Sequence, residues 1–122
     1  MKQANAKQKQ WMKDITKWAY DNLHQIYGVR YLNANFQRHH VLGRSAKHNK
    51  VEIGHWFILP IPFELHDVSS NHPENVTHRK KDFVKRFGNQ RDLFLMLVED
   101  MRSCGYELPP EEVCEAIMST NA

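Results

Sequence analysis

Two stretches decide the expected fold: Phe36-Gln37-Arg38-His39-His40-Val41-Leu42-Gly43 and Ile53-Gly54-His55-Trp56-Phe57-Ile58-Leu59-Pro60. The first predicts a short strand that Gly43 closes. The second is rich in aromatic and β-branched residues and predicts a strand that stops at Pro60. Residues 44–50 between them are polar and predict a loop. Together the two stretches predict a β-hairpin.

Helices are predicted on both sides of this hairpin. The chain has 122 residues, which is enough for one domain and too few for two. Apolar side chains recur at spacings of three and four over residues 5–27, which predicts an N-terminal helix that Gly28 ends. Amphipathic patterns predict C-terminal helices within residues 90–118, the first of them over residues 91–102. We therefore expect a single α+β domain over residues 1–122, with its core at about residues 36–88.

Two short helical segments are predicted inside this core. Pro62 is suited to open a short helix that carries His66, because proline is favoured in a first helical turn. Thr77 is a candidate cap for a second helix, which would run to Phe87 and end at Gly88.

The composition excludes several classes of protein. The chain is 41% hydrophobic and 25% charged, without the bias of collagen-like or disordered sequences. No apolar run is long enough to span a membrane, and the N-terminus lacks the apolar centre of a signal peptide. We expect a cytoplasmic protein with no membrane partner, in which Cys104 and Cys114 are buried or half-buried free thiols.

The charge is unevenly distributed, although the formal net charge is only +3. Residues 1–50 hold ten Lys/Arg against two acids, and residues 51–78 hold four acids and no Lys/Arg. Residues 79–102 are basic again, and the last twenty residues are acidic. Two basic blocks on either side of a central segment favour a protein that binds phosphate groups on both sides of a site in that segment.

The central segment is rich in histidine, since seven of the eight histidines lie between positions 39 and 78. Adjacent residues of a strand point to opposite faces, so one of His39 and His40 can face a metal while the other stays free. A hairpin followed by a helix brings His66 close to them. This pattern suits phosphodiester hydrolysis, in which a metal neutralises phosphate charge and a neutral histidine takes a proton from water.

These motifs resemble a known family. His39-His40-Val41-Leu42-Gly43-Arg44, then His55-Trp56-Phe57-Ile58-Leu59-Pro60-Ile61, then His66 resemble the ββα-metal motif of HNH (His-Me finger) nucleases. More narrowly, the chain is similar to the Ref family of phage recombination-enhancement nucleases, which act with RecA. The further matching segments are Trp11-Met12-Lys13-Asp14-Ile15, Thr77-His78-Arg79-Lys80-Lys81-Asp82-Phe83 and Arg86-Phe87-Gly88. The resemblance covers roughly residues 8–100.

The resemblance implies a role for each matching position. His40 would be the general base that activates water, and His39 and His66 would be metal ligands. His78 would be a supporting ligand or a phosphate contact. The expected nucleic-acid-binding residues are Arg44, Lys47, Lys50, Arg79, Lys80 and Lys81.

The chain also departs from the family pattern. Phe57 stands at the spacing of the central Asn, and no cysteine pair for a structural zinc is present near Pro62 and Phe63. Asp67 replaces a second helix histidine and Ser70 a further one. We therefore expect fewer protein ligands and more waters, which favours Mg²⁺ or Mn²⁺, with Zn²⁺ as an alternative. The candidates for an alternative ligand, or for a group that orients one, are Asp67, His55 and His72.

The predicted function is that of a phage-type, metal-dependent endonuclease that hydrolyses DNA in recombination. The DNA could be single-stranded or duplex, the partner a RecA-type filament, and the location the host cytoplasm. The alternative is a catalytically retired HNH scaffold that binds nucleic acid or inhibits a host enzyme or defence complex, and a weaker one is a metal-stabilised structural subunit. DNA against RNA, sequence preference and oligomeric state stay open.

Overall fold

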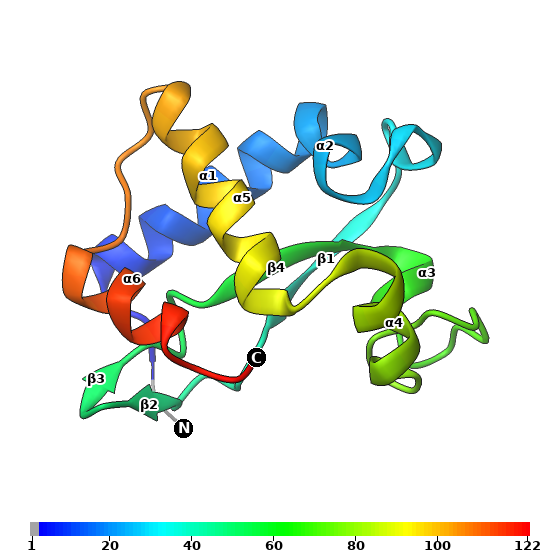
Figure 1. Cartoon of the computed structure of the whole chain (residues 1–122). Coiled ribbons are helices and arrows are strands. Elements are labelled where there is room, and N and C mark those ends of the chain that lie inside the picture. The colour runs from blue at the N-terminus through cyan, green and yellow to red at the C-terminus, as the bar shows by residue number, and fades with distance from the viewer. Residues whose placement is uncertain (1–2) are drawn as a thin grey trace.

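A small antiparallel sheet lies at the centre of the α+β fold, and helices cover it (Figure 1). The structure is a computed structural model and describes residues 3–122. Its strands are β1 (Phe36–His40), β2 (Lys47–His48), β3 (Val51–Glu52) and β4 (Ile58–Pro62). Its helices are α1 (Ala6–Asn22), α2 (His24–Tyr27), the 3-10 turn η1 (Val29–Tyr31), α3 (Phe63–His66), α4 (Lys80–Phe87), α5 (Gln90–Ser103) and α6 (Glu111–Met118).

The predicted N-terminal helix is present, as α1 followed at once by α2. Asn5 and Gln8 form a capping box, in which each side chain accepts a hydrogen bond from the other residue's backbone N–H. The buried stripe of α1 is Trp11, Ile15, Trp18 and Ala19. Gly28 ends α2 with a φ of 102°, which glycine adopts without strain.

The central sheet pairs β1 with β4, so that His39 lies opposite Leu59 and Arg38 opposite Pro60. The predicted end of the second strand at Pro60 was wrong, because β4 includes both Pro60 and Pro62. Val41 N–H donates to Phe57 O and Phe63 N–H to Asn35 O, so the odd-numbered residues of this strand bond to β1. The two prolines therefore fall where the backbone nitrogen faces away from β1, and no ladder bond is lost.

The segment between β1 and β4 is not the plain loop that was predicted. β2 and β3 form a miniature hairpin whose turn residues, Asn49 and Lys50, both have positive φ, as in a type I′ turn. This hairpin lies beside α6, and Asn49 Nδ2 donates to Ser119 Oγ (Figure 1). Residues 53–57, which were predicted to be strand, instead form turns that lead into β4.

Two backbones meet closely where this segment returns to the sheet. Ala46 O accepts from the N–H groups of both Ile53 and Gly54. A Cβ at position 54 would lie 2.1 Å from Arg44 O, so only glycine fits there. Gly54 thus allows the backbone of Arg44 to approach closely the segment that leads into His55.

The α3 helix follows β4 directly and carries His66, as predicted. The prediction of Thr77 as a helix cap was wrong: α4 begins at Lys80, and Thr77 Oγ1 donates to His66 O instead. Asn75 is fully buried, and its Nδ2 donates to Glu64 O and Asp67 O. The segment after α3 is therefore tied back onto the backbone of this short helix.

The predicted C-terminal helical layer consists of α5 and α6. Both α1 and α5 contact β4, whose five residues are all buried. Phe94 of α5 packs edge-on against Trp11 and Phe57, and Trp18 Nε1 donates to Asp100 Oδ2. Cys104 and Cys114 are free thiols as predicted, but only Cys114 is half-buried; the prediction of burial was wrong for Cys104, which is exposed at the end of α5. Within residues 3–122, no helix has the length and apolar character needed to cross a membrane.

Candidate functional site

Two histidines meet at the junction of β1 and α3. His39 Nδ1 lies 3.1 Å from His66 Nε2, and the two rings are inclined at 62°. Two nitrogens bound at about 2.1 Å to one ion are separated by roughly 3.0–3.4 Å at octahedral or tetrahedral angles. The spacing of the pair is that of a hydrogen bond between the two rings, and it is also that of two ligands of one metal ion. The structure brings together the two residues that the sequence predicted as principal ligands.

Gln37 fixes the orientation and protonation of His66. Gln37 Nε2 donates to Asp67 Oδ1, which sets the amide so that its Oε1 faces His66 Nδ1 at 2.5 Å. Because an amide oxygen only accepts, His66 Nδ1 carries the proton. The lone pair of His66 is then on Nε2, directed toward His39. This is the arrangement by which a neighbouring group orients a ligating histidine.

Both imidazoles of this pair are held neutral. Burial lowers the pKa of His39 to about 4, and the neighbouring His66 and the charge of Lys80 act in the same direction. Burial also lowers the pKa of His66, against the charge of Asp67. A neutral imidazole offers a lone pair, which is the form that ligates metals.

Gln90, the first residue of α5, lies beside His39. Its side chain acts on His39 and raises the pKa of that imidazole against the effect of burial. Gln90 is only 2% exposed, yet within residues 3–122 its Oε1 has no hydrogen bond of acceptable geometry. A buried amide oxygen without a partner costs free energy. A cation or a hydrogen-bond donor at this oxygen would remove that cost, which makes Gln90 a candidate third ligand.

His40 lies on the other face of β1, as the alternation of a strand requires. Its Nε2 is 3.2 Å from Nδ1 of His55, which is buried. Burial lowers the pKa of His40 to about 4, and His55, Arg44 and Arg38 also lower it. His55, predicted as an alternative ligand or as a group that orients one, contacts His40.

Two of the other candidate ligands, His78 and His72, have hydrogen-bond partners elsewhere. His78 Nε2 donates to Val68 O, and His72 Nδ1 accepts from Glu74 N–H. Asp67 lies beside the pair: it accepts from Gln37, the amide that faces His66, which is the position expected of a group that orients a ligand. Among residues 3–122, no three His, Cys, Asp or Glu side chains form a group that could hold a metal ion.

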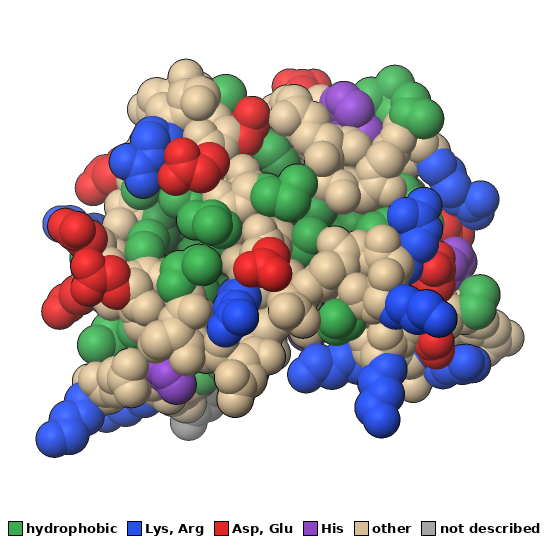
Figure 2. Space-filling view, viewed as in Figure 1, with side chains coloured by type: hydrophobic (Ala, Val, Ile, Leu, Met, Phe, Trp, Pro, Cys, Tyr) green, Lys and Arg blue, Asp and Glu red, His purple; other side chains and the backbone are tan. Residues whose placement is uncertain are grey.

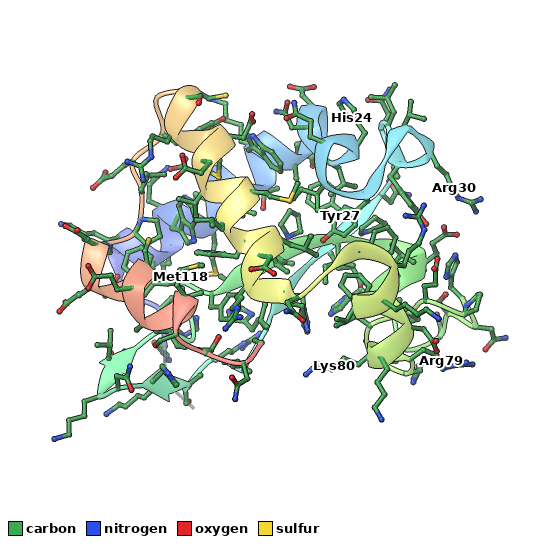
Figure 3. The ribbon with its side chains drawn as sticks, in the orientation of Figure 1. His24, Tyr27, Arg30, Arg79, Lys80 and Met118 are labelled. Carbon is green, nitrogen blue, oxygen red and sulfur yellow. The ribbon has the colours of Figure 1, made fainter. Side chains whose placement is uncertain are left out.

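The predicted nucleic-acid contacts fall into two groups. Arg79, Lys80 and Lys81 lie where α4 begins, and Figures 2 and 3 show basic side chains gathered there. Lys80 is near enough to influence His39, whereas Arg79 is paired with Asp82 at 3.0 Å. Arg44 influences His40. By contrast, Lys47 and Lys50 lie in the β2–β3 hairpin, beside the acidic helix α6 (Figures 1 and 2).

Sequence reasoning missed Gln37 and Gln90. A signal existed for Gln37, because it is two residues before His39 and shares its face of the strand. No such signal exists for Gln90, which only the packing of α5 against the sheet brings near His39. No family model, curated protein or solved structure matches this chain.

Proposed function

We propose that this protein is a metal-dependent nuclease that hydrolyses phosphodiester bonds of DNA. The observation that carries the proposal is the convergence of His39 Nδ1 and His66 Nε2 at 3.1 Å, on a strand pair followed by a helix. This is the arrangement expected of a ββα-metal, His-Me finger core. The proposed holders of the ion are His39 and His66, with Gln90 Oε1 as the third donor.

A divalent cation at this position supplies positive charge that stabilises the phosphate and the leaving oxygen during hydrolysis. The chain's own residues supply the rest. His40 is neutral and accepts a proton from the attacking water. A new bond forms between that water oxygen and phosphorus, while the bond from phosphorus to the leaving ester oxygen breaks. His55 orients the His40 ring, and Arg38 and Arg44 hold the charged strand near it, while Lys80 lies near His39.

The experiment is a cleavage assay on single-stranded and duplex DNA with Mg²⁺, Mn²⁺ or EDTA. We expect cleavage that EDTA stops and that His40→Ala abolishes, with the fold retained by circular dichroism. His39→Ala and His66→Ala should abolish cleavage and also weaken metal binding. Cleavage by His40→Ala at the wild-type rate contradicts the mechanism.

A second candidate function is nucleic-acid binding without cleavage. It is favoured by the small donor set, since no third His, Cys, Asp or Glu joins the His39–His66 pair among the described residues. Stoichiometric DNA binding with no cleavage in any metal would select this second function.

A further inference from the structure

A basic groove runs between α1 and β1 on the His40 face of the sheet. It consists of two hollows that share Arg38. The larger, of about 800 Å³, is lined by residues that include Lys13, Lys17, Tyr20 and Phe36. The smaller, of about 540 Å³, is lined by residues that include Lys9 and His40. The groove therefore leads from Tyr20 to the proposed general base.

The cations of this groove are available to a ligand. Lys9, Lys13 and Lys17 are four residues apart on α1, which spaces them by about 6 Å along the helix axis. They are exposed, as is Arg38, and none of these four residues forms an ion pair with another residue in the range 3–122. A regular row of cations beside a strand suits a phosphate backbone that runs along the groove.

Within residues 3–122, no acidic residue lines this groove. The described residues that line its two hollows include no Asp or Glu. Asp14 instead lines a separate hollow with Lys7 and Gln10, on the other flank of the helix, where Gln10 donates to it. Asp21, the other acid of α1, follows Lys17 by four residues and is not among the residues that line the groove.

Tyr20 provides an aromatic surface at the far end of the groove. The Tyr20 side chain is 67% exposed and is not part of the buried core. Phe36 packs against it at 74°, with the ring centroids 5.5 Å apart, and so holds the Tyr20 ring in place. An exposed, fixed aromatic ring beside a row of cations is the combination that binds unpaired bases. Paired bases inside a duplex cannot stack on it.

We infer that the α1–β1 groove binds single-stranded nucleic acid, with the three lysines and Arg38 on successive phosphates and Tyr20 stacked on a base. This inference rests on the proposed function, because a strand bound in the groove reaches His40, the proposed general base. The substrate class of the nuclease site would then be single-stranded nucleic acid.

The test is fluorescence anisotropy of a labelled twelve-nucleotide single strand in EDTA, so that binding is measured without cleavage. The DNA strand, the RNA strand of the same sequence and the DNA duplex are compared. We expect at least one single strand to bind ~10-fold more tightly than the duplex. The RNA arm shows whether the sugar is distinguished. Equal or tighter binding of the duplex overturns the inference.

Variants separate the groove from general electrostatics. Lys13→Gln/Lys17→Gln should weaken single-strand binding ~10-fold and reduce the salt dependence by roughly 1.4 in the slope of log K against log salt. Tyr20→Ala should weaken binding ~10-fold with the salt slope unchanged, and Tyr20→Phe should restore it. The control Lys7→Gln/Arg102→Gln makes the same charge change outside the groove.

Two outcomes distinguish this inference from the proposed function. If the control pair weakens binding as much as the groove pair, or if Tyr20→Ala has no effect, the groove inference fails even when the protein cleaves DNA. If the groove variants behave as expected and no metal supports cleavage, the groove inference stands and the nuclease proposal fails.

Discussion

The two faces of β1 carry two different kinds of histidine environment. On one face, His39 meets His66 with the amides of Gln37 and Gln90 around them. On the other face, His40 meets His55, and Arg38, Arg44 and Lys9 lie around it. The first set is rich in acceptors and suits a cation, whereas the second is cationic and suits a phosphate. Because His39 and His40 are adjacent residues at the end of β1, the two environments follow one another directly along the chain.

The largest expected effects come from replacing the central histidine of each face. His39→Ala and His40→Ala should each lower the cleavage rate by at least ~100-fold, because each removes a group required in the reaction. Only His39→Ala should abolish Mn²⁺ binding, measured by isothermal titration calorimetry. His48→Ala, on the separate β2–β3 hairpin, is the matched control and should change neither quantity. Loss of Mn²⁺ binding in His40→Ala would show that the two faces are not separate.

The residues that orient each histidine should divide in the same way. Gln37→Leu removes the acceptor that holds the proton on His66 Nδ1, and we expect a metal affinity ~10–100-fold weaker. His55→Phe removes the partner of His40 and should lower the cleavage rate ~10-fold with the metal affinity unchanged. Calorimetry and steady-state kinetics on both variants measure the two quantities. The division is contradicted if His55→Phe weakens metal binding as much as Gln37→Leu does.

Gln90 offers a test of the third donor in both directions. Gln90→Met keeps a similar volume without the amide oxygen, and it should weaken Mn²⁺ binding ~10-fold. Gln90→Glu places a carboxylate there and should strengthen binding, because a charged oxygen ligand attracts the cation more strongly. Thermal unfolding of both variants in EDTA checks that the fold is kept. An affinity that is the same for both variants would remove Gln90 from the donor set.

The smallest effect is on stability against pH. The pKa values of His39 and His40 are lowered to about 4 and that of His66 is also lowered, so the folded state binds fewer protons than the unfolded state below about pH 6.5. Stability should be complete above that pH and decrease as the pH falls toward 4. In EDTA, we expect a loss of about 5–10 °C in Tm over this range.

A matched variant assigns this loss to the buried histidines. His39→Gln removes one of the groups that must stay neutral in the folded protein, so its Tm should decrease less between pH 6.5 and pH 4 than that of the wild type. His48→Gln is the control, and its decrease should equal the wild-type decrease. Identical profiles for His39→Gln and the wild type would show that His39 does not contribute.

Local sequence signals predicted most of the helices and the main strand pair. Helical periodicity and Gly28 located the N-terminal helix, and the apolar stripe of residues 91–102 located α5 within one residue at each end. The second strand was misplaced because proline was interpreted as a stop. That rule fails when a proline nitrogen faces away from the pairing strand, and the register that decides this depends on the partner.

The candidate site was predictable to a similar extent. The order and spacing of the histidines placed His39 and His66 together and His40 on the opposite face. The pairing of His40 with His55 depends on the turns of residues 53–57, which look like strand in the sequence. Gln90 reaches the site through the packing of α5, a long-range contact that no local pattern encodes.

The prolines of β4 also limit the pairing of a further strand with the outer edge of the sheet. Pro60 and Pro62 occupy alternate positions on the backbone edge that faces away from β1, and Pro60 O accepts from Tyr27 Oη. An incoming strand would find no N–H donors at these two positions. Edge-to-edge association of two molecules, the usual start of β-aggregation, is therefore blocked at β4 even when the helices above it open transiently. Pro60, at which the predicted strand ended too early, is thus one of the two residues that oppose the addition of a third strand at this edge.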